Sequence, residues 1–229
     1  MIAPAAATAA GVHRLDLDAI QRALCDLAGD FAEINAQLDD PHEPLSAVVV
    51  DNLMAGYELV DQALAARIDL LAFGQSAQLL ELNARVLCGS DPAERRRLAP
   101  HLAATEQHFY DDQQGGVRDL VEWYAGHRRL SAWRRAAGAY VRAISTPQLW
   151  LEGNHRAGAL LMSWILARDG LPPVVPTRAS VGPMLVCSSR IKQLRKGSFG
   201  MLLREPRARN ELAQLLERQA DPGFLRPAG

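Results

Sequence analysis

The chain has little cysteine, and its charges nearly cancel. Its 229 residues include three cysteines, Cys25, Cys88 and Cys187, which lie far apart and have no second Cys or His at metal-binding spacing. This pattern excludes a disulfide-stapled fold and favours buried thiols in a reducing compartment over a metal or redox role. The formal net charge of -1, from 25 basic and 26 acidic side chains, excludes an overall electrostatic field that would attract nucleic acid or an anionic membrane.

Long apolar runs are missing as well. The longest apolar stretches, such as residues 157–167, fall short of the ~20 residues that a membrane-spanning helix needs. Residues 1–12 are mostly Ala, Pro, Thr and Gly, without the basic start or apolar centre of a signal peptide, so we expect a disordered Ala-rich tail there. We therefore expect a soluble, cytoplasmic protein that binds neither nucleic acid nor membrane, with residues 13–229 forming a single domain.

The sequence is rich in apolar residues at helical spacing. Hydrophobic residues make up 48% of the chain and charged residues 22%, which is enough for a packed core. Apolar positions recur every three or four residues in several segments, and no period-2 alternation is long enough for a substantial sheet. The expected fold class is therefore all-α, with at most a short β-hairpin. The predicted helices cover residues 16–38, 46–64, 76–86, 117–144 with a break allowed at Gly126, 154–169 and 206–219.

Two further segments are harder to assign. Residues 89–116 are polar, and the arginine run at 95–97 is more typical of a solvated helix face than of a nucleic-acid patch, because acidic residues surround it. The end of this segment, residues 111–116, is predicted to be a surface loop. Residues 174–189 are predicted to be less regular than the helices around them.

The helix at residues 154–169 is predicted to be the central helix of the fold. Its apolar residues, among them Leu161, Trp164 and Ile165, cover nearly the whole circumference and leave no polar face for solvent. Gly170 is placed to cap the C-terminus, and the two prolines that follow prevent the helix from continuing. We expect this helix to be the most buried of all.

The turn that leads into this helix carries residues suited to an anion. It reads Glu-Gly-Asn-His-Arg and ends at a helix N-terminus, where unpaired backbone N–H groups and the helix dipole favour negative charge. Gly153 lets the backbone approach a ligand, Asn154 can cap the helix or donate through its amide, and Arg156 offers a planar fork to phosphate oxygens. Glu152 is suited to hold Mg²⁺, which binds through one or two carboxylates together with phosphate oxygens.

A simpler interpretation of the same turn is purely structural. Glu152 and Asn154 can cap a buried helix while Arg156 pairs with a surface carboxylate, since Gly-Asn pairs are common in turns. Spacing alone favours neither interpretation.

The segment from Gln148 to Ala159 resembles the Fic motif, in which His-x-Phe-x-Asp/Glu-Gly-Asn-Gly-Arg-x-x-Arg leads into a central helix. Trp150 stands in the place of the Phe, and residues 152–156 supply the acidic residue, the first Gly, the Asn and the first Arg in register. The resemblance extends over about residues 119–173. It implies a Fic/Doc-like helical bundle, and residues 109–116 lie roughly where that family has its flap.

The resemblance also implies a function. A Fic-like protein binds ATP or another nucleotide with Mg²⁺ and transfers a nucleotidyl or phosphoryl group to a hydroxyl of a protein target. Glu152 would hold the metal, and Gly153, Asn154 and Arg156 would bind the phosphates.

Three positions depart from the motif. Gln148 stands in place of the catalytic His, and an amide cannot take a proton from an attacking hydroxyl near neutral pH. Ala159 replaces the second Arg, which removes one phosphate contact. His155 replaces the second Gly, where Doc-type relatives have Lys and transfer a phosphoryl group instead. His155 can contact phosphate, act as a relocated base, or be a structural histidine bonded within the turn.

An upstream segment bears a fainter likeness to the family. Residues 46–52 loosely resemble the inhibitory helix of Fic proteins, with Asp51 in the place of its glutamate. The alternative is that Ser46 caps a helix that begins with a buried apolar turn. The motif arginine that such an inhibitory residue would meet is Ala159 in this chain.

Two hypotheses follow from the motif. The first is a Fic-like transferase of altered chemistry, with Gln148 and His155 at its catalytic positions. The second is a catalytically inactive Fic-fold module that binds a ligand or a protein partner through the same pocket. A third possibility is an unrelated helical protein in which the motif arises by chance.

Overall fold

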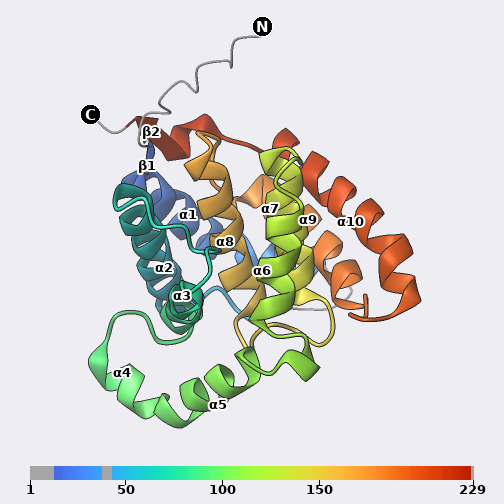
Figure 1. Ribbon diagram of the computed structural model, residues 1–229. Coiled ribbons are helices and arrows are strands. Elements are labelled where there is room, and N and C mark those ends of the chain that lie inside the picture. Colours follow the sequence, from blue (N-terminus) through green and yellow to red (C-terminus); the bar gives the residue numbers. More distant parts are fainter. Residues whose placement is uncertain (1–12, 38–42, 228–229) are drawn as a thin grey trace, which may run out of the picture.

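The computed structural model describes residues 13–37 and 43–227, which form an almost entirely helical protein (Figure 1). The predicted tail at residues 1–12 lies outside the described residues. The all-α class is confirmed. The α-helices are α1 (Leu17–Asn35), α2 (Ala47–Ala65), α3 (Ser76–Cys88), α4 (Pro92–Arg97), α5 (Ala99–Phe109), α6 (Val117–Gly126), α7 (Ala132–Ile144), α8 (Asn154–Arg168), α9 (Arg178–Lys192) and α10 (Phe199–Arg218). The short elements are the 3₁₀ turns η1 (Asp112–Gln114) and η2 (Pro222–Phe224) and the strands β1 (His13–Leu15) and β2 (Leu225–Pro227).

The two strands join the ends of the described chain. β1 pairs with β2 in an antiparallel ladder, with Leu15 opposite Leu225. Arg14 forms an ion pair with the buried Asp61 on α2, and the Leu15 N–H donates to the same carboxylate at 2.9 Å. Burial alone would raise the pKa of Asp61, but these partners hold it below its ordinary value. No strand forms at residues 109–116, the predicted flap, where α5 ends and η1 follows.

α8 is the central helix, as predicted. Every residue from Leu160 to Ala167 is fully buried, including Leu161, Trp164 and Ile165. Figure 1 shows α8 in the middle of the molecule, and it packs against α7, α2 and α3. Gly158 brings α7 especially close, because a Cβ there would lie 2.7 Å from Cδ2 of Tyr140. This close approach holds the Tyr140 side chain against the start of α8.

Several predicted helices are confirmed in detail. Ser46 caps α2 by accepting the Val49 N–H at 3.4 Å, so the capping alternative for this segment is confirmed, and Asp51 is exposed. The arginine run at 95–97 forms the last turn of α4, where Arg97 pairs with Glu94 in solvent. The long segment 117–144 is divided into α6 and α7 just after Gly126. None of the helices in the described ranges combines the length and hydropathy that a bilayer crossing needs.

The irregular structure predicted for residues 174–189 is wrong, since most of this segment forms α9. A capping box between Thr177 and Ser180 starts the helix, and it packs on α1, α7 and α10. Its Gly182 and Pro183 are poor helix formers, which explains the weak sequence pattern that the cap and the packing override. α10 likewise begins at Phe199 and contains Pro206 within it, rather than starting there.

The expectation of three buried thiols is wrong for Cys25, which is exposed on α1. The buried face of this helix includes Leu24 and Leu27, and a residue one step from Leu24 is rotated by about a quarter of a turn toward solvent. Cys88 is buried and Cys187 is half-buried. Burial raises the pKa of both thiols above the ordinary value, which makes them less reactive than an exposed cysteine.

Candidate functional site

The loop between α7 and α8 is anchored in the core at its centre. Leu149 and Trp150 are buried, and the Leu149 N–H donates to the Ala143 carbonyl at 2.8 Å. The Trp150 ring stacks on Phe109 of α5 with ring centroids 6.2 Å apart. The turn at the start of α8 is therefore attached to a fixed loop.

Asn154 holds this loop in shape. Its side-chain oxygen accepts the Trp150 N–H at 3.0 Å, and its side-chain nitrogen donates to the Trp150 carbonyl at 2.6 Å. The same nitrogen lies 3.3 Å from Oε1 of Gln148. From α3, Asn83 donates to the Glu152 carbonyl at 2.9 Å. The Asn154 amide thus serves the loop, so this residue has only its backbone N–H to offer an anion.

Gly153 sets the direction in which the chain enters α8. Its φ of 72° lies in the left-handed region, which a residue with a Cβ adopts at a cost. The N-cap residue is Gly153 itself, which has no side chain with which to cap α8. The first-turn N–H groups of a helix have no partner within the helix, and here they lie at the positive end of its dipole.

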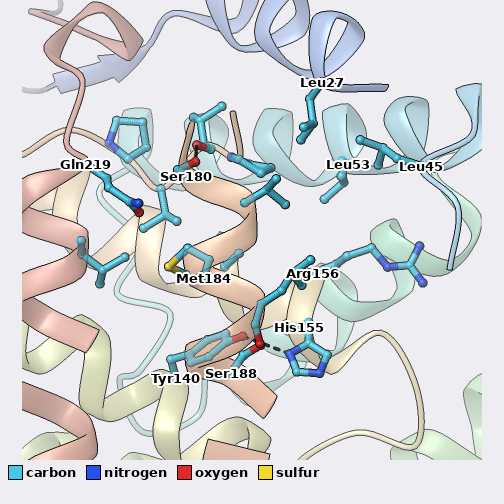
Figure 2. A pocket seen from close by; sticks show the side chains of 18 of the residues that line it. Leu27, Leu45, Leu53, Tyr140, His155, Arg156, Ser180, Met184, Ser188 and Gln219 are labelled. Carbon is cyan, nitrogen blue, oxygen red and sulfur yellow. Dashed lines mark hydrogen bonds between the residues drawn. The ribbon is translucent and has the colours of Figure 1, made fainter. Parts of the chain in front are cut away.

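A cavity of about 340 Å³ opens beside this turn. Glu152, Gly153, Asn154, His155 and Arg156 all line it, so the structure brings five of the six predicted site residues to one pocket. The remainder of the wall comes mainly from α1, α2, α9 and the segment between α8 and α9 (Figure 2). Residues from distant parts of the chain therefore meet at the start of the central helix.

The two charged side chains of the turn differ in their surroundings. Arg156 donates to the Val86 carbonyl at 3.2 Å and lies 3.3 Å from a carboxylate oxygen of Glu43, which is itself 65% exposed. This is the kind of pairing that the structural interpretation of the turn predicted. Glu152 is 60% exposed and lies 3.6 Å from Nε2 of His101, which is too long for a hydrogen bond. The Glu152 carboxylate is therefore accessible to solvent.

The His155 side chain lies against α7. Its Nδ1 lies 3.0 Å from the hydroxyl of Tyr140, and both residues line the cavity together with Ser188 of α9. Figure 2 shows these three side chains gathered at one end of the pocket, while the guanidinium of Arg156 reaches away from them. Burial raises the pKa of Tyr140 well above its usual range, so the phenol keeps its proton. The phenol can then donate this hydrogen bond to Nδ1.

Gln148 is not among the described residues that line the cavity, although its side chain contacts one of them, Asn154. Its side-chain nitrogen donates to the Ile144 carbonyl at 3.3 Å, and its Oε1 faces Asn154. The Gln148 carbonyl lies 2.8 Å from Nε2 of His108, the histidine next to the predicted flap. The residue at the motif's catalytic position thus belongs to the interior of the loop, while His155 belongs to the pocket.

Sequence reasoning missed several residues of this site. Tyr140, Ser188 and Glu43 line the cavity but belong to no motif in the sequence. The one clue in the sequence is Gly158, since a glycine in an otherwise buried helix indicates close approach of a neighbour. Ala159, where the resemblance expects an arginine, also lines the cavity.

The resemblance to the Fic motif implies Mg²⁺ bound at the turn. No cluster of three or more His, Cys, Asp or Glu side chains able to hold a metal is present in the described ranges. Glu152 offers an exposed carboxylate at the pocket mouth, where Glu43 supplies a second one. Such a pair fits Mg²⁺ only in company with a phosphate ligand, which supplies further oxygens.

Comparison with known proteins adds no relative. No family model, no curated protein and no solved structure matches the chain. The likeness to the Fic motif therefore stays a prediction carried by residues 148–159.

Proposed function

We propose that this chain binds a small ligand with a phosphate or similar anionic group, and that the anion lies at the turn before α8. The observation that carries the proposal is the opening of a helix N-terminus with glycine as its N-cap residue, and with Arg156 beside it, into a cavity of about 340 Å³. Backbone N–H groups and a guanidinium are the groups that bind phosphate oxygens. A cavity of this volume falls within the range of small-molecule sites.

Binding is better supported than ordinary group transfer. Transfer to a hydroxyl requires a base that takes its proton, and the Gln148 amide has no useful basicity. Its two polar atoms are also used in the loop, by the Ile144 carbonyl and by Asn154. The protein is thus proposed to be a ligand-binding module, with the bound anion replacing Glu43 as the partner of Arg156.

The test is ligand-induced thermal stabilisation of the wild type and of two matched variants. A ligand held only by the folded state at a hundred times its Kd stabilises it by roughly 2.7 kcal/mol. ATP, other nucleotides and simple phosphate esters are screened with and without Mg²⁺. Arg156→Ala is expected to lose the shift, measured from its own ligand-free melting temperature. Arg118→Ala, which removes an arginine 68% exposed on α6, is expected to keep it.

A screen in which no phosphate-bearing compound shifts the wild type would count against the proposal. An equal shift in both variants would show that the anion binds elsewhere. Both results would favour a module that binds a protein partner.

A second candidate, Mg²⁺-dependent transfer of a nucleotidyl or phosphoryl group to a protein, rests on His155 and Glu152 lining the same pocket. His155 would act as the base in place of Gln148, and Glu152 would hold the metal. Labelling with radioactive ATP tests it: wild-type labelling that is lost in His155→Ala supports transfer. If only the double variant Gln148→His with His155→Gly labels, the wild type is a binding module that has lost the reaction.

A further inference from the structure

The inner part of the cavity differs from its mouth in chemistry. Beyond the turn the wall is formed mostly by hydrocarbon side chains from three helices. These include Leu27 and Phe31 of α1, Leu53 of α2, and Val181, Met184 and Leu185 of α9. Figure 2 shows Leu27, Leu53 and Met184 around the same space. Such a wall binds a ligand by removing apolar surface from water.

The hydroxyl groups in this inner wall already have partners within the protein. The Tyr57 hydroxyl donates to the Val174 carbonyl at 2.6 Å, and Ser188 Oγ donates to the Leu185 carbonyl at 2.9 Å. Ser180 Oγ accepts the Thr177 N–H at 2.8 Å. Apart from the Gln219 amide, which also lines the cavity, a base or sugar placed there would find few partners for its polar groups, and this weakens binding. The inner cavity therefore favours a hydrocarbon over a nucleoside.

Ala159 keeps the inner cavity apolar at the position where the Fic motif has its second arginine. It follows His155 by four residues on α8, so the two side chains lie on the same face of the helix and both line the cavity. An arginine at this position would bring a cation into the space between α8 and α9. With alanine there, the cations of α8 at the pocket are confined to its first turn.

We propose that the pocket binds an amphiphile: a phosphate monoester of a hydrocarbon alcohol, with the phosphate at the turn and the chain in the inner cavity. This inference rests on the proposed function and names the class of ligand. The phosphate meets the N-terminus of α8 and Arg156, and the chain runs between α8, α1 and α9. Polar and apolar ends of one ligand thus match the two ends of one cavity.

Titration calorimetry with four probes below their micelle concentrations tests the ligand class. Decyl phosphate combines the head group and the chain, while inorganic phosphate and decanol each carry only one of them. Decyltrimethylammonium carries the chain with the opposite charge. Decyl phosphate is expected to bind at least about tenfold more tightly than each of the other three. Equal binding of the two charged surfactants would overturn the inference, because it would show a detergent effect.

Variants place the chain in the inner cavity. Ala159→Arg is expected to weaken decyl phosphate binding at least about tenfold, because it buries a cation beside the chain. Ala65→Arg makes the same change at an exposed position in the last turn of α2 and is expected to leave binding unchanged. Ala159→Met adds volume without charge and keeps the test decisive if the arginine variant does not fold. It is expected to shift the preference from decyl toward hexyl phosphate, and an unchanged preference contradicts the placement.

The outcomes separate this inference from the proposed function. If ATP binds and depends on Arg156 while decyl phosphate binds no better than inorganic phosphate, the amphiphile is wrong and the anion site stands. If decanol binds as well as decyl phosphate and no phosphate compound depends on Arg156, the anion site itself is wrong.

Discussion

The two ends of α8 are built in opposite ways. At the C-terminal end, the Gly170 N–H donates to the Ala167 carbonyl and the Leu171 N–H to the Leu166 carbonyl, both at 3.0 Å, which satisfies the last carbonyls as in a Schellman cap. At the N-terminal end, Gly153 leads into the helix with no side-chain cap. One end is thus completed by a Schellman-type cap, and the other begins at a glycine at the edge of a cavity.

The side chains around the two ends of α8 differ in the same way. Near the C-terminal end, Arg168 stacks over Trp164 with 4.5 Å from Cζ to the ring centroid and pairs with Asp69 at 3.0 Å, while Arg135 pairs with Asp169. At the N-terminal end, Arg156 pairs with Glu43, and both residues line the pocket. The same helix is thus held by paired side chains at one end and borders the proposed anion site at the other.

The largest expected effect belongs to the middle of α8, which both ends share. Leu161→Ala should lower the free energy of unfolding by about 2–5 kcal/mol, because the side chain is fully buried and leaves a cavity. Urea denaturation measures it. The ligand-induced thermal shift should persist in the folded fraction. A loss below about 1 kcal/mol would mean that α8 is not the centre of the core.

The next effect distinguishes the two ends. Asn154→Ala should cost about 1–3 kcal/mol, because it leaves the buried Trp150 N–H and carbonyl without their side-chain partner. It should also weaken phosphate binding, because the loop before α8 loses the hydrogen bonds that hold its shape. Asp169→Ala, at the other end, should leave binding unchanged. If calorimetry shows that both variants bind phosphate equally well, the two ends of α8 do not differ in their effect on binding.

Two glycine variants sharpen the comparison. Gly153 and Gly170 both have a left-handed φ, of 72° and 76°, so an alanine at each should cost about 1–2 kcal/mol of stability. Only Gly153→Ala should also reduce phosphate binding, because its Cβ would lie 3.0 Å from Nδ2 of Asn83, which holds the turn. Parallel melting and binding curves of the two variants check this. Reduced binding in Gly170→Ala would contradict it.

The smallest effect concerns pH. Nζ of Lys196 donates to the Gly115 carbonyl at 2.8 Å, and burial lowers the pKa of this side chain to about 8 from 10.5. Since the unfolded chain holds this proton at higher pH, the unfolding free energy contributed by Lys196 rises between pH 8 and 10.5 and is lost as the pH falls through 8. The slope is at most about 1.4 kcal/mol per pH unit.

Comparison with Lys196→Met isolates this dependence from the titration of cysteines and tyrosines. The wild type should gain stability relative to the variant between pH 8 and 9 in urea denaturation. The arginines at the C-terminal end of α8 keep their charge over this pH range, so they contribute no such slope to the unfolding free energy. If the stability difference between the wild type and the variant stays constant with pH, Lys196 is not held in a desolvated position.

The sequence by itself determined the elements whose causes are local. The apolar circumference of residues 154–169 indicates a central helix, Ser46 indicates a helix start, and the two features are present in the structure. The Glu-Gly-Asn-His-Arg turn places a glycine where the chain needs a left-handed residue. These features depend on side chains within a few positions of one another, which is the range over which periodicity, caps and turns act.

Only the tertiary structure decided what the turn faces. The helix α9 forms despite a weak local pattern, because its packing against α1 and α10 compensates for Gly182 and Pro183. That packing brings Leu27 and Met184, which are far apart in the chain, to one apolar cavity. It also leaves Gln148 inside the loop. Local patterns specify which residues form a helix start, but the polarity and occupancy of the space beside it depend on contacts between distant segments.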